Sequence, residues 1–527
     1  MNEAWSRREF LGAMLAGSAC ALAPIGVMAR PAVAPGVQGL VLRDVLLVDG
    51  SGKPGRRTDV LVRGDRIERI GAVDEASVRG LRVVDGGGRV LAPGFIDLHT
   101  HGDPLREAYT QYLAMGVTTV LLGQDGGSPS LSDARRAADS LPAWMDAVAN
   151  ANPDINVATL SGHGALRRRA GIDDGTRKPS DAQLERLQAI LDRDLRAGAF
   201  GMSTGLEYVP GRYAELRELA SLGPVIARHD GVAMSHMRNE DVGDVRDSIR
   251  ELVAASGPAR AHVSHLKMVY GKGEATAEDL LGFLRGLRAD GTRLTADAYP
   301  YEASYTGVAI LFPEWALPPS DYAEVSESRH DELRAHLQQR MERRNGPDAL
   351  LFGTGPHAGK TLAQVAAEQD KAYPDALLEI GPGGGQAAHF VMDRALQDRL
   401  LLASFVALGS DGSPGGSHPR SAGTFAKFIQ EFVVAAPRLS IEEAVRKASA
   451  LPASILGLSD RGVIREGARA DLLVFDPGKV RARADYVHPE AMAEGFDLVV
   501  VNGQPAYEAG EPVGRSGRLL RRGEAIA

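Results

Sequence analysis

The central part of the chain alternates short apolar runs with longer segments in which apolar residues recur every three or four positions. The first pattern is typical of strands buried on both faces, and the second of helices with one buried face. Eight apolar runs can be distinguished, at residues 95–98, 117–122, 155–160, 200–203, 232–236, 261–266, 293–297 and 405–408. Helical patterns at residues 181–196, 242–255 and 277–287 separate several of them. This alternation predicts an α/β fold, a parallel (β/α)8 barrel of the TIM type over residues 92–459.

Both ends of the chain have a different pattern. Between residues 38 and 91, short runs rich in valine and leucine are broken by glycine-containing turns, and similar runs return at residues 470–475 and 498–501. Runs of this length and spacing are typical of a small antiparallel β-structure. We therefore predict one β-sandwich domain formed jointly by residues 38–91 and 460–527.

About one hundred residues separate the seventh predicted strand from the eighth. A structureless loop of that length is rare inside a compact domain. Helical patterns at residues 331–344 and 362–369 instead favour an inserted subdomain at about residues 305–400.

Charge and the N-terminal segment limit the partners and the location. The net charge is -8 and the isoelectric point is about 6.0, which gives no reason to expect nucleic acid as a partner. The segment Ser-Arg-Arg-Glu-Phe-Leu-Gly at residues 6–12 has a twin-arginine pattern, and a short apolar run and small residues follow it. We expect residues 1–34 to be a signal peptide for twin-arginine export to the periplasm or outside the cell, with no stable membrane insertion after its removal. Cys20, the single cysteine, lies inside it, so no thiol ligand is expected in the mature chain.

Side chains that bind metals follow five of the predicted strands. They are His99 and His101 after the first, Asp125 after the second, His236 and His265 at the ends of the fifth and sixth, and Asp411 after the eighth. The carboxyl ends of barrel strands meet at one rim, and imidazoles with carboxylates are ligands that Zn²⁺ and similar ions prefer. The sequence therefore predicts a divalent metal site at this rim. His262 lies three residues before His265, so strand alternation predicts that it faces the surrounding helices instead.

Residues 91–101, with the sequence Leu-Ala-Pro-Gly-Phe-Ile-Asp-Leu-His-Thr-His, resemble the first metal motif of the amidohydrolase superfamily. The chain is similar, more narrowly, to the N-acyl-D-amino-acid deacylases (D-aminoacylases) at residues 161–164, 202–208, 235–240, 263–267, 297–301 and 409–412. The likeness covers nearly the whole mature chain. It implies a β-sandwich beside a (β/α)8 barrel that binds one or two divalent ions, with zinc as the expected metal.

The resemblance also implies how the ligands are divided. His99, His101 and Asp411 would face one metal position, and His236, His265 and Asp125 the other. The deacylases carry a cysteine within Gly-Asn-Cys-Gly where this chain has Asp125 within Gly-Gln-Asp-Gly. A carboxylate is harder than a thiolate and weakens the preference for zinc, so the identity and number of the ions stay open.

The expected reaction is hydrolysis of the amide bond of a small molecule, an N-acyl-D-amino acid or a dipeptide with a C-terminal D-residue. Asp411 is the candidate general base. The resemblance suggests Lys267, Tyr299 and Arg420 as binding groups for the substrate carboxylate, and His163 is a further candidate for contact with substrate. Two alternatives stay open: another amidohydrolase activity on a cyclic amide, imide or ester, and a metal-free barrel that serves as a binding protein.

Overall fold

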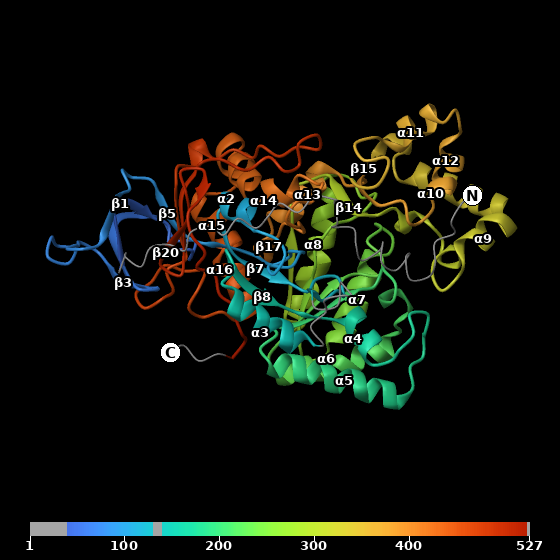
Figure 1. Ribbon diagram of the computed structural model, residues 1–527, viewed down its shortest axis with the longest axis horizontal. Helices are drawn as coiled ribbons and strands as arrows, with labels where there is room; N and C mark the ends of the chain where they lie inside the picture. Colours follow the sequence, from blue (N-terminus) through green and yellow to red (C-terminus); the bar gives the residue numbers. More distant parts are fainter. Residues whose placement is uncertain (1–38, 130–139, 524–527) are drawn as a thin grey trace.

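The computed structural model describes residues 39–129 and 140–523. Figure 1 shows a β-rich part at one end of the molecule, a barrel in the middle and a mainly helical part beyond it. The proposed signal peptide lies outside the described residues.

Eight parallel strand positions form the barrel, and they coincide with the eight predicted apolar runs. They are β6 (Phe95–Asp97), β7 (Val117–Leu122), β8 (Asn156–Thr159) with β9 (Ser161–Gly162), β10 (Gly201–Gly205), β11 (Val232–His236), β12 (Arg260–Val263), β13 (Leu294–Ala298) and β17 (Val406–Leu408). The third position is divided at Leu160, where β8 pairs with β7 and β9 pairs with β10. A parallel bridge between Thr100 and Gly412 joins the ends of β6 and β17 and closes the ring.

Helices surround the strands, and each buries one apolar face against them. They include α3 (Leu141–Ala151), α5 (Asp181–Arg196), α6 (Leu216–Arg228), α7 (Val245–Ser256), α8 (Gly273–Ala289), α13 (Arg394–Leu401), α14 (Arg420–Phe428) and α15 (Ile441–Ala448). The bounds of α5 are those predicted, and its sequence specifies the start. Ser180 and Gln183 form a capping box at its start, and leucines at helical spacing form its buried face.

A nine-stranded sheet forms the second part of the molecule, and both chain ends contribute strands to it. Its strands are β1 (Gly39–Leu47), β2 (Arg56–Arg63), β3 (Arg66–Ile70), β4 (Arg82–Asp85), β5 (Val90–Pro93), β18 (Leu472–Phe475), β19 (Phe496–Val501), β20 (Gln504–Glu508) and β21 (Glu511–Pro512). Antiparallel pairing of β5 with β18 joins the two segments. Leu42 and Val60 share a buried cluster with Leu472 and Val500, so the sheet curves around a common core.

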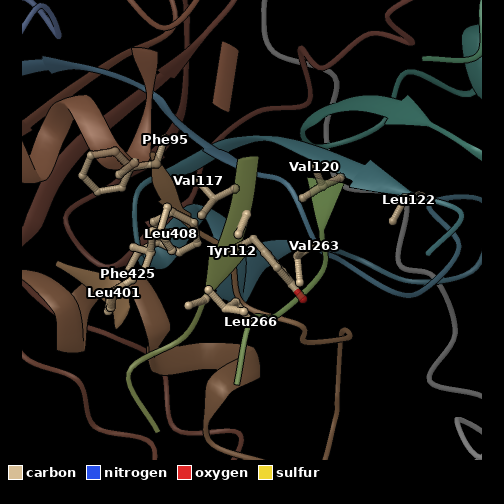
Figure 2. Packing of buried hydrophobic residues seen from close by; sticks show 14 of the residues in the cluster. Phe95, Tyr112, Val117, Val120, Leu122, Val263, Leu266, Leu401, Leu408 and Phe425 are labelled. Carbon is tan, nitrogen blue, oxygen red and sulfur yellow. The ribbon is translucent and has the colours of Figure 1, made fainter. Parts of the chain in front are cut away.

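Aromatic side chains fix the sheet to the barrel. Phe95 of β6 stacks on Phe425 with ring centroids 5.6 Å apart, and its edge meets Phe496 of β19 at 5.9 Å (Figure 2 shows Phe95 and Phe425). The same core cluster includes Val117 and Leu408 of the barrel strands. The first barrel strand, which leads into the candidate site, is therefore held on both sides by buried rings.

The chain between β13 and β17 forms an inserted subdomain. A three-stranded sheet of β14 (Ala303–Gly307), β16 (Gln386–Phe390) and β15 (Leu350–Phe352) is joined by helices α9 (Tyr322–Ser328), α10 (His330–Arg343), α11 (Leu362–Glu368) and α12 (Tyr373–Ile380). It has a hydrophobic cluster of its own. Helix α13 falls within the predicted range but belongs to the barrel, because Leu396 and Leu400 pack in one cluster with Leu280 of α8.

The last described residues leave the nine-stranded sheet and cross the end of the barrel at which its strands begin. The Val157 N–H donates to the Arg518 carbonyl at 2.9 Å, and the Leu520 N–H donates to the Val157 carbonyl at 2.7 Å. The Arg522 N–H donates to the carbonyl of Gly198, just before β10. The predicted assignment of the whole range 460–527 to the β domain therefore does not hold for residues 517–522.

Candidate metal centre

His99 and His101 follow β6 and approach Asp411, which follows β17. The Asp411 N–H donates to the His99 carbonyl, and the His101 N–H donates to the Gly412 carbonyl, both at 2.8 Å. This pairing brings the Nε2 atoms of His99 and His101 within 3.5 and 3.2 Å of Asp411 Oδ1. His99 is fully buried, whereas the His101 side chain is 35% exposed. The site is thus open to small molecules from the side of His101.

Asp125 lies between two groups of ligand-type atoms. Its Oδ1 is 3.4 Å from His99 Nε2, and its Oδ2 is 3.6 Å from His101 Nε2. On the other side, Oδ1 is 3.6 Å from His265 Nε2 and Oδ2 is 3.9 Å from His236 Nδ1. The backbone of Asp125 has φ +52°, and a Cβ on Gly205 would lie only 2.2 Å from its carbonyl oxygen. A glycine at position 205 therefore lets this turn approach the ends of β10 and β11.

The six predicted ligands fit a divalent metal. One potential group consists of His99, His101, Asp125 and Asp411, and a second of Asp125, His236 and His265, with all ligand atoms of a group within 4.8 Å of one another. Ligand atoms about 2 Å from a common ion lie at comparable separations. His99 Nε2 and Asp125 Oδ1 are buried and have no hydrogen-bond partner in the protein, as expected of atoms that bind an ion. The role of each residue as a ligand stays a prediction.

The charges of the site keep both carboxylates ionised. Burial would raise the pKa of Asp125, but His99 and His265 hold it well below its usual range. Burial would likewise raise the pKa of Asp411, but Arg420 and His99 lower it. Burial disfavours a charged His99, yet the two carboxylates raise its pKa well above the ordinary value. Asp125 and Asp411 are therefore in the form that metal binding requires.

Asp297 on β13 supports the histidines, and the sequence analysis assigned it no role. Its Oδ1 accepts the His265 N–H at 2.9 Å, and its Oδ2 lies 3.9 Å from His99 Nδ1. Burial opposes ionisation of Asp297, but the hydrogen bond to His262 and the nearby charge of His99 lower its pKa. Its place at the end of a barrel strand was the same signal that identified the six candidates.

The prediction that His262 faces the helices is wrong. Its Nε2 lies 2.7 Å from Asp297 Oδ2, and its Nδ1 lies 2.8 Å from Thr295 Oγ1. The regular strand β12 ends at Val263, and His265 has φ +37°. Strand alternation therefore does not continue to His265, and both histidines contact Asp297.

Asp97 joins the two strands that carry His99 and Asp411. Its Oδ1 accepts the N–H groups of His99 at 3.1 Å and of Ser410 at 2.9 Å, and its Oδ2 accepts the Ser410 hydroxyl. Burial raises the pKa of Asp97 to about 6, against the effect of these hydrogen bonds. Asp97 thus holds together the turn that carries His99 and the turn that carries Asp411. No pattern in the sequence predicted this role.

Lys267, a predicted carboxylate-binding residue, is paired within the protein. Its Nζ donates to both oxygens of Glu240 at 2.7 and 2.9 Å and lies 2.7 Å from His265 Nδ1. Burial alone would lower the pKa of Lys267, but the adjacent Glu240 carboxylate raises this pKa above its usual value. Glu240 also lies 3.2 Å from His265 Nδ1, so this carboxylate orients the imidazole.

Arg420 is a buried cation beside the site, paired with one of the predicted ligands. Its guanidinium pairs with Asp411 Oδ2 at 2.7 Å, donates to the Tyr305 carbonyl at 3.3 Å and lies 5.1 Å from the ring centre of Tyr299. The hydroxyl of Tyr299 is buried and has no hydrogen-bond partner in the protein. Binding of a substrate carboxylate by Arg420 and Tyr299 stays a prediction.

The structure does not bring His163 into contact with the six predicted ligands. Its Nε2 lies 2.8 Å from Glu218 Oε1, and Glu218 also pairs with the buried Arg167 at 2.9 Å. This arrangement holds the start of α4 (His163–Arg169) against α6. The predicted contact of His163 with substrate stays a prediction.

Comparisons with known proteins agree with this geometry. The amidohydrolase family matches residues 82–378 and 403–507. The N-acyl-D-glutamate deacylase of Alcaligenes xylosoxydans xylosoxydans is 34% identical over 93% of this chain and 97% of its own length. The D-aminoacylase of the same organism is 30% identical over 92% and 97%. A solved structure is also similar: that of N-acyl-D-glutamate deacylase from Bordetella bronchiseptica in complex with zinc and a phosphonate inhibitor. It superposes on this chain with a TM-score of 0.80 at 30% identity, and the match covers 92% of this chain and 100% of that chain.

Proposed function

Because the chain belongs to the amidohydrolase family, we propose that its metal centre hydrolyses the amide bond of N-acyl-D-amino acids to a carboxylate and a free D-amino acid. The enzyme acts on linear amides and uses a divalent metal. The observation that carries this function is the convergence of four imidazoles and two carboxylates at the carboxyl ends of five barrel strands, with the cation Arg420 beside them.

Different residues of the chain have different roles in the hydrolysis. When bound, a divalent ion acts as a Lewis acid and lowers the pKa of a water molecule toward about 7. Asp411 accepts a proton from the attacking water and transfers it to the nitrogen of the breaking C–N bond, because an amine leaves poorly unless it is protonated. Arg420, with Tyr299, binds the carboxylate of the amino acid. Glu240 orients the imidazole of His265, and Asp297 holds the backbone N–H of the same residue.

A substrate panel tests this function. The metal-loaded enzyme is expected to hydrolyse N-acetyl-D-amino acids and to leave their L-enantiomers and a hydantoin largely unchanged. Faster hydrolysis of the hydantoin would assign the chain to cyclic amides instead. Equal rates for both enantiomers would contradict the stereochemical part of the proposal.

The role of Asp411 is tested by Asp411→Asn, which keeps the size of the side chain and removes its basicity. We expect kcat to fall by about 10²-fold or more, the usual contribution of a general base. Metal content, measured on the same preparation, separates a lost base from a lost ligand. An Asn variant that kept both its metal and near-normal turnover would refute the assignment.

We also propose export by the twin-arginine route to the periplasm or the outside of the cell. The support is the Arg7-Arg8 pair, followed by a short apolar run and small residues. In the described part of the chain, every helix is too short or too polar to cross a membrane. Changing both arginines to lysine is expected to leave the enzyme in the cytoplasm on cell fractionation, and continued export would contradict the route.

A further inference from the structure

A cavity of about 370 Å³ lies at the end of the barrel at which the strands begin, opposite to the metal centre. It is lined by Val232 and Arg260, the first residues of β11 and β12, by the turn between α8 and β13, and by Ile455 of α16 (Ala450–Leu456). Pockets that bind small molecules have volumes of about 300 to 1,000 Å³. Because the predicted metal ligands follow the other ends of the strands, a molecule bound here does not reach the metal centre.

Three arginines line this cavity, and no carboxylate is among its lining residues in the described part of the chain. Backbone carbonyls fix the three guanidinium groups. Arg260 donates to the Ile455 carbonyl at 2.9 Å. Arg293 donates to the Pro258 carbonyl at 2.7 Å, and Arg288 donates to the first carbonyl of β13. A neutral carbonyl holds a guanidinium group in place without cancelling its charge.

Cations outnumber carboxylates around the cavity. Asp230 pairs with Arg260 at 3.6 Å and with Arg293 at 3.7 Å, and it also contacts Arg522. Its side chain is 64% exposed, so water weakens each of these pairs. Arg288 has no ion pair among the described residues. Within the ion pairs of the described chain, four arginines therefore share one exposed carboxylate.

Arg260 is the most buried of the three lining arginines, and it shows the effect of this imbalance. Its side chain is 17% exposed, and its Nε is buried without a hydrogen-bond partner among the described residues. Burial and the charge of Arg522 lower the pKa of Arg260, and the charge of Asp230 opposes them. An anion in the cavity would reduce the repulsion between the guanidinium groups and offer an acceptor to the unpaired donor.

We propose that this cavity binds a small phosphate ester, at a second site remote from the metal centre. Guanidinium groups match phosphate oxygens through paired hydrogen bonds, and three of them suit a dianion better than a carboxylate with a single charge. Thr292 and Thr295 also line the cavity, and a hydroxyl is a donor that phosphate oxygens accept. The volume leaves room for the organic part of the ester. The inference goes beyond the proposed deacylase function and does not depend on it.

Calorimetry on the metal-loaded enzyme at low salt tests the inference, with glycerol 3-phosphate as the probe. We expect a dissociation constant below about 1 mM, and weaker binding as KCl is added, because salt screens charge pairs. Acetate, which carries one charge, is expected to bind at least about tenfold more weakly. A dissociation constant above about 1 mM for the ester, or equal affinity for acetate, would overturn the phosphate site.

Variants are needed to place the binding in the cavity, because phosphate groups also bind metal ions. Arg288→Met and Arg293→Met are each expected to weaken binding of glycerol 3-phosphate at least about fivefold, since each removes a charged hydrogen bond. Arg288 has no ion pair to lose, and methionine can keep its apolar contact with Phe405, whose ring centre lies 4.9 Å from the guanidinium carbon. Arg285→Met, which changes an exposed arginine on the same helix, is the matched control and should bind the ester like the wild type.

Tm and the hydrolysis of an N-acyl-D-amino acid are measured on the same preparations. Both are expected to stay near the wild-type values in the two cavity variants, so that a loss of ester binding is not a loss of the fold. Unchanged ester affinity in both variants would overturn the inference, because the ester would then bind elsewhere. Arginine-dependent binding in an enzyme without deacylase activity would remove the proposed function and support the cavity site.

Discussion

Asp125 is the side chain that the group with His99, His101 and Asp411 shares with the group of His236 and His265. Its oxygens lie 3.4 to 3.9 Å from imidazole nitrogens of His99, His101, His236 and His265. The deacylases that the sequence resembles carry a cysteine here. A carboxylate can place one oxygen toward each ion and prefers harder metals than a thiolate does. We therefore expect the chemistry of residue 125 to influence which ion the centre selects.

Asp125→Cys tests that dependence. The thiolate is expected to raise the selectivity for Zn²⁺ over Mn²⁺ by about tenfold or more, because soft sulfur ligands favour zinc. The measurement is the content of each metal after equilibration with both ions. Asp125→Ala is the matched control and should lose affinity for both metals. Unchanged selectivity in the cysteine variant would mean that residue 125 does not bind the ion.

The sequence predicts some residues of the site better than others. The six candidate ligands could be located because each follows an apolar strand, and strand ends meet at one rim. Asp297, Glu240 and Glu207 act through other side chains, and their partners are brought close only by the fold. His262 was misplaced because alternation was extended past Val263, where the regular strand ends. Local periodicity carries no information beyond the end of an element.

At the scale of elements, local patterns predicted strands and helices but not their long-range pairings. The eight barrel strands are short, almost fully buried runs, and the capping box at Ser180 marks the start of α5 in the sequence. The division of the third strand at Leu160 and the path of residues 517–522 depend on partners far along the chain. Helix α13 was assigned to the insertion because only its packing on α8 identifies it as part of the barrel.

Helix α15 carries a buried lysine whose charge state depends on pH. Lys447 is fully buried, donates to the carbonyls of Ala403 and Val406, and has its pKa lowered by burial to about 7 from a reference value of 10.5. Below pH 7 the lysine is charged in both states, so the cost of burying the charge is fully present. Between pH 7 and 10.5 the folded chain has released the proton and the unfolded chain retains it. Stability therefore rises with pH in this window.

Lys447→Met removes this proton exchange. From pH 7 to pH 10 the wild type is expected to gain stability relative to the variant, by at most about 1.4 kcal/mol per pH unit. The free energy of unfolding is measured in urea at pH 6, 8 and 10 on metal-saturated protein. Lys272→Met, on the surface, serves as the control and should show a difference that does not vary with pH. A pH-independent difference for the buried variant as well would contradict the lowered pKa.

At the scale of the whole molecule, the metal centre lies where the parts of the chain meet. The predicted ligands come from the ends of β6, β7, β11, β12 and β17, and Arg420 connects Asp411 to Tyr305 of the insertion. The nine-stranded sheet holds β6 through Phe95, and the C-terminal residues cross the far end of the barrel. An ion at this point joins segments more than 300 residues apart in the sequence.

Removal of the metal should therefore lower the stability of the folded protein as well as its activity. A ligand that binds only the folded state stabilises it by RT ln(1 + [L]/Kd), about 4 kcal/mol at a free concentration of a thousand times Kd. Dialysis against a chelator is expected to lower Tm, and added Zn²⁺ should restore both Tm and hydrolysis. Asp125→Ala is the control, because a chelator should change its Tm much less.

Since the inserted subdomain has its own hydrophobic cluster, protease sites exposed by metal removal should fall mainly in the barrel loops at residues 99–103, 123–128 and 409–416. Cleavage concentrated in the insertion, or a Tm that does not change after dialysis against the chelator, would show that these ligands do not stabilise the barrel rim.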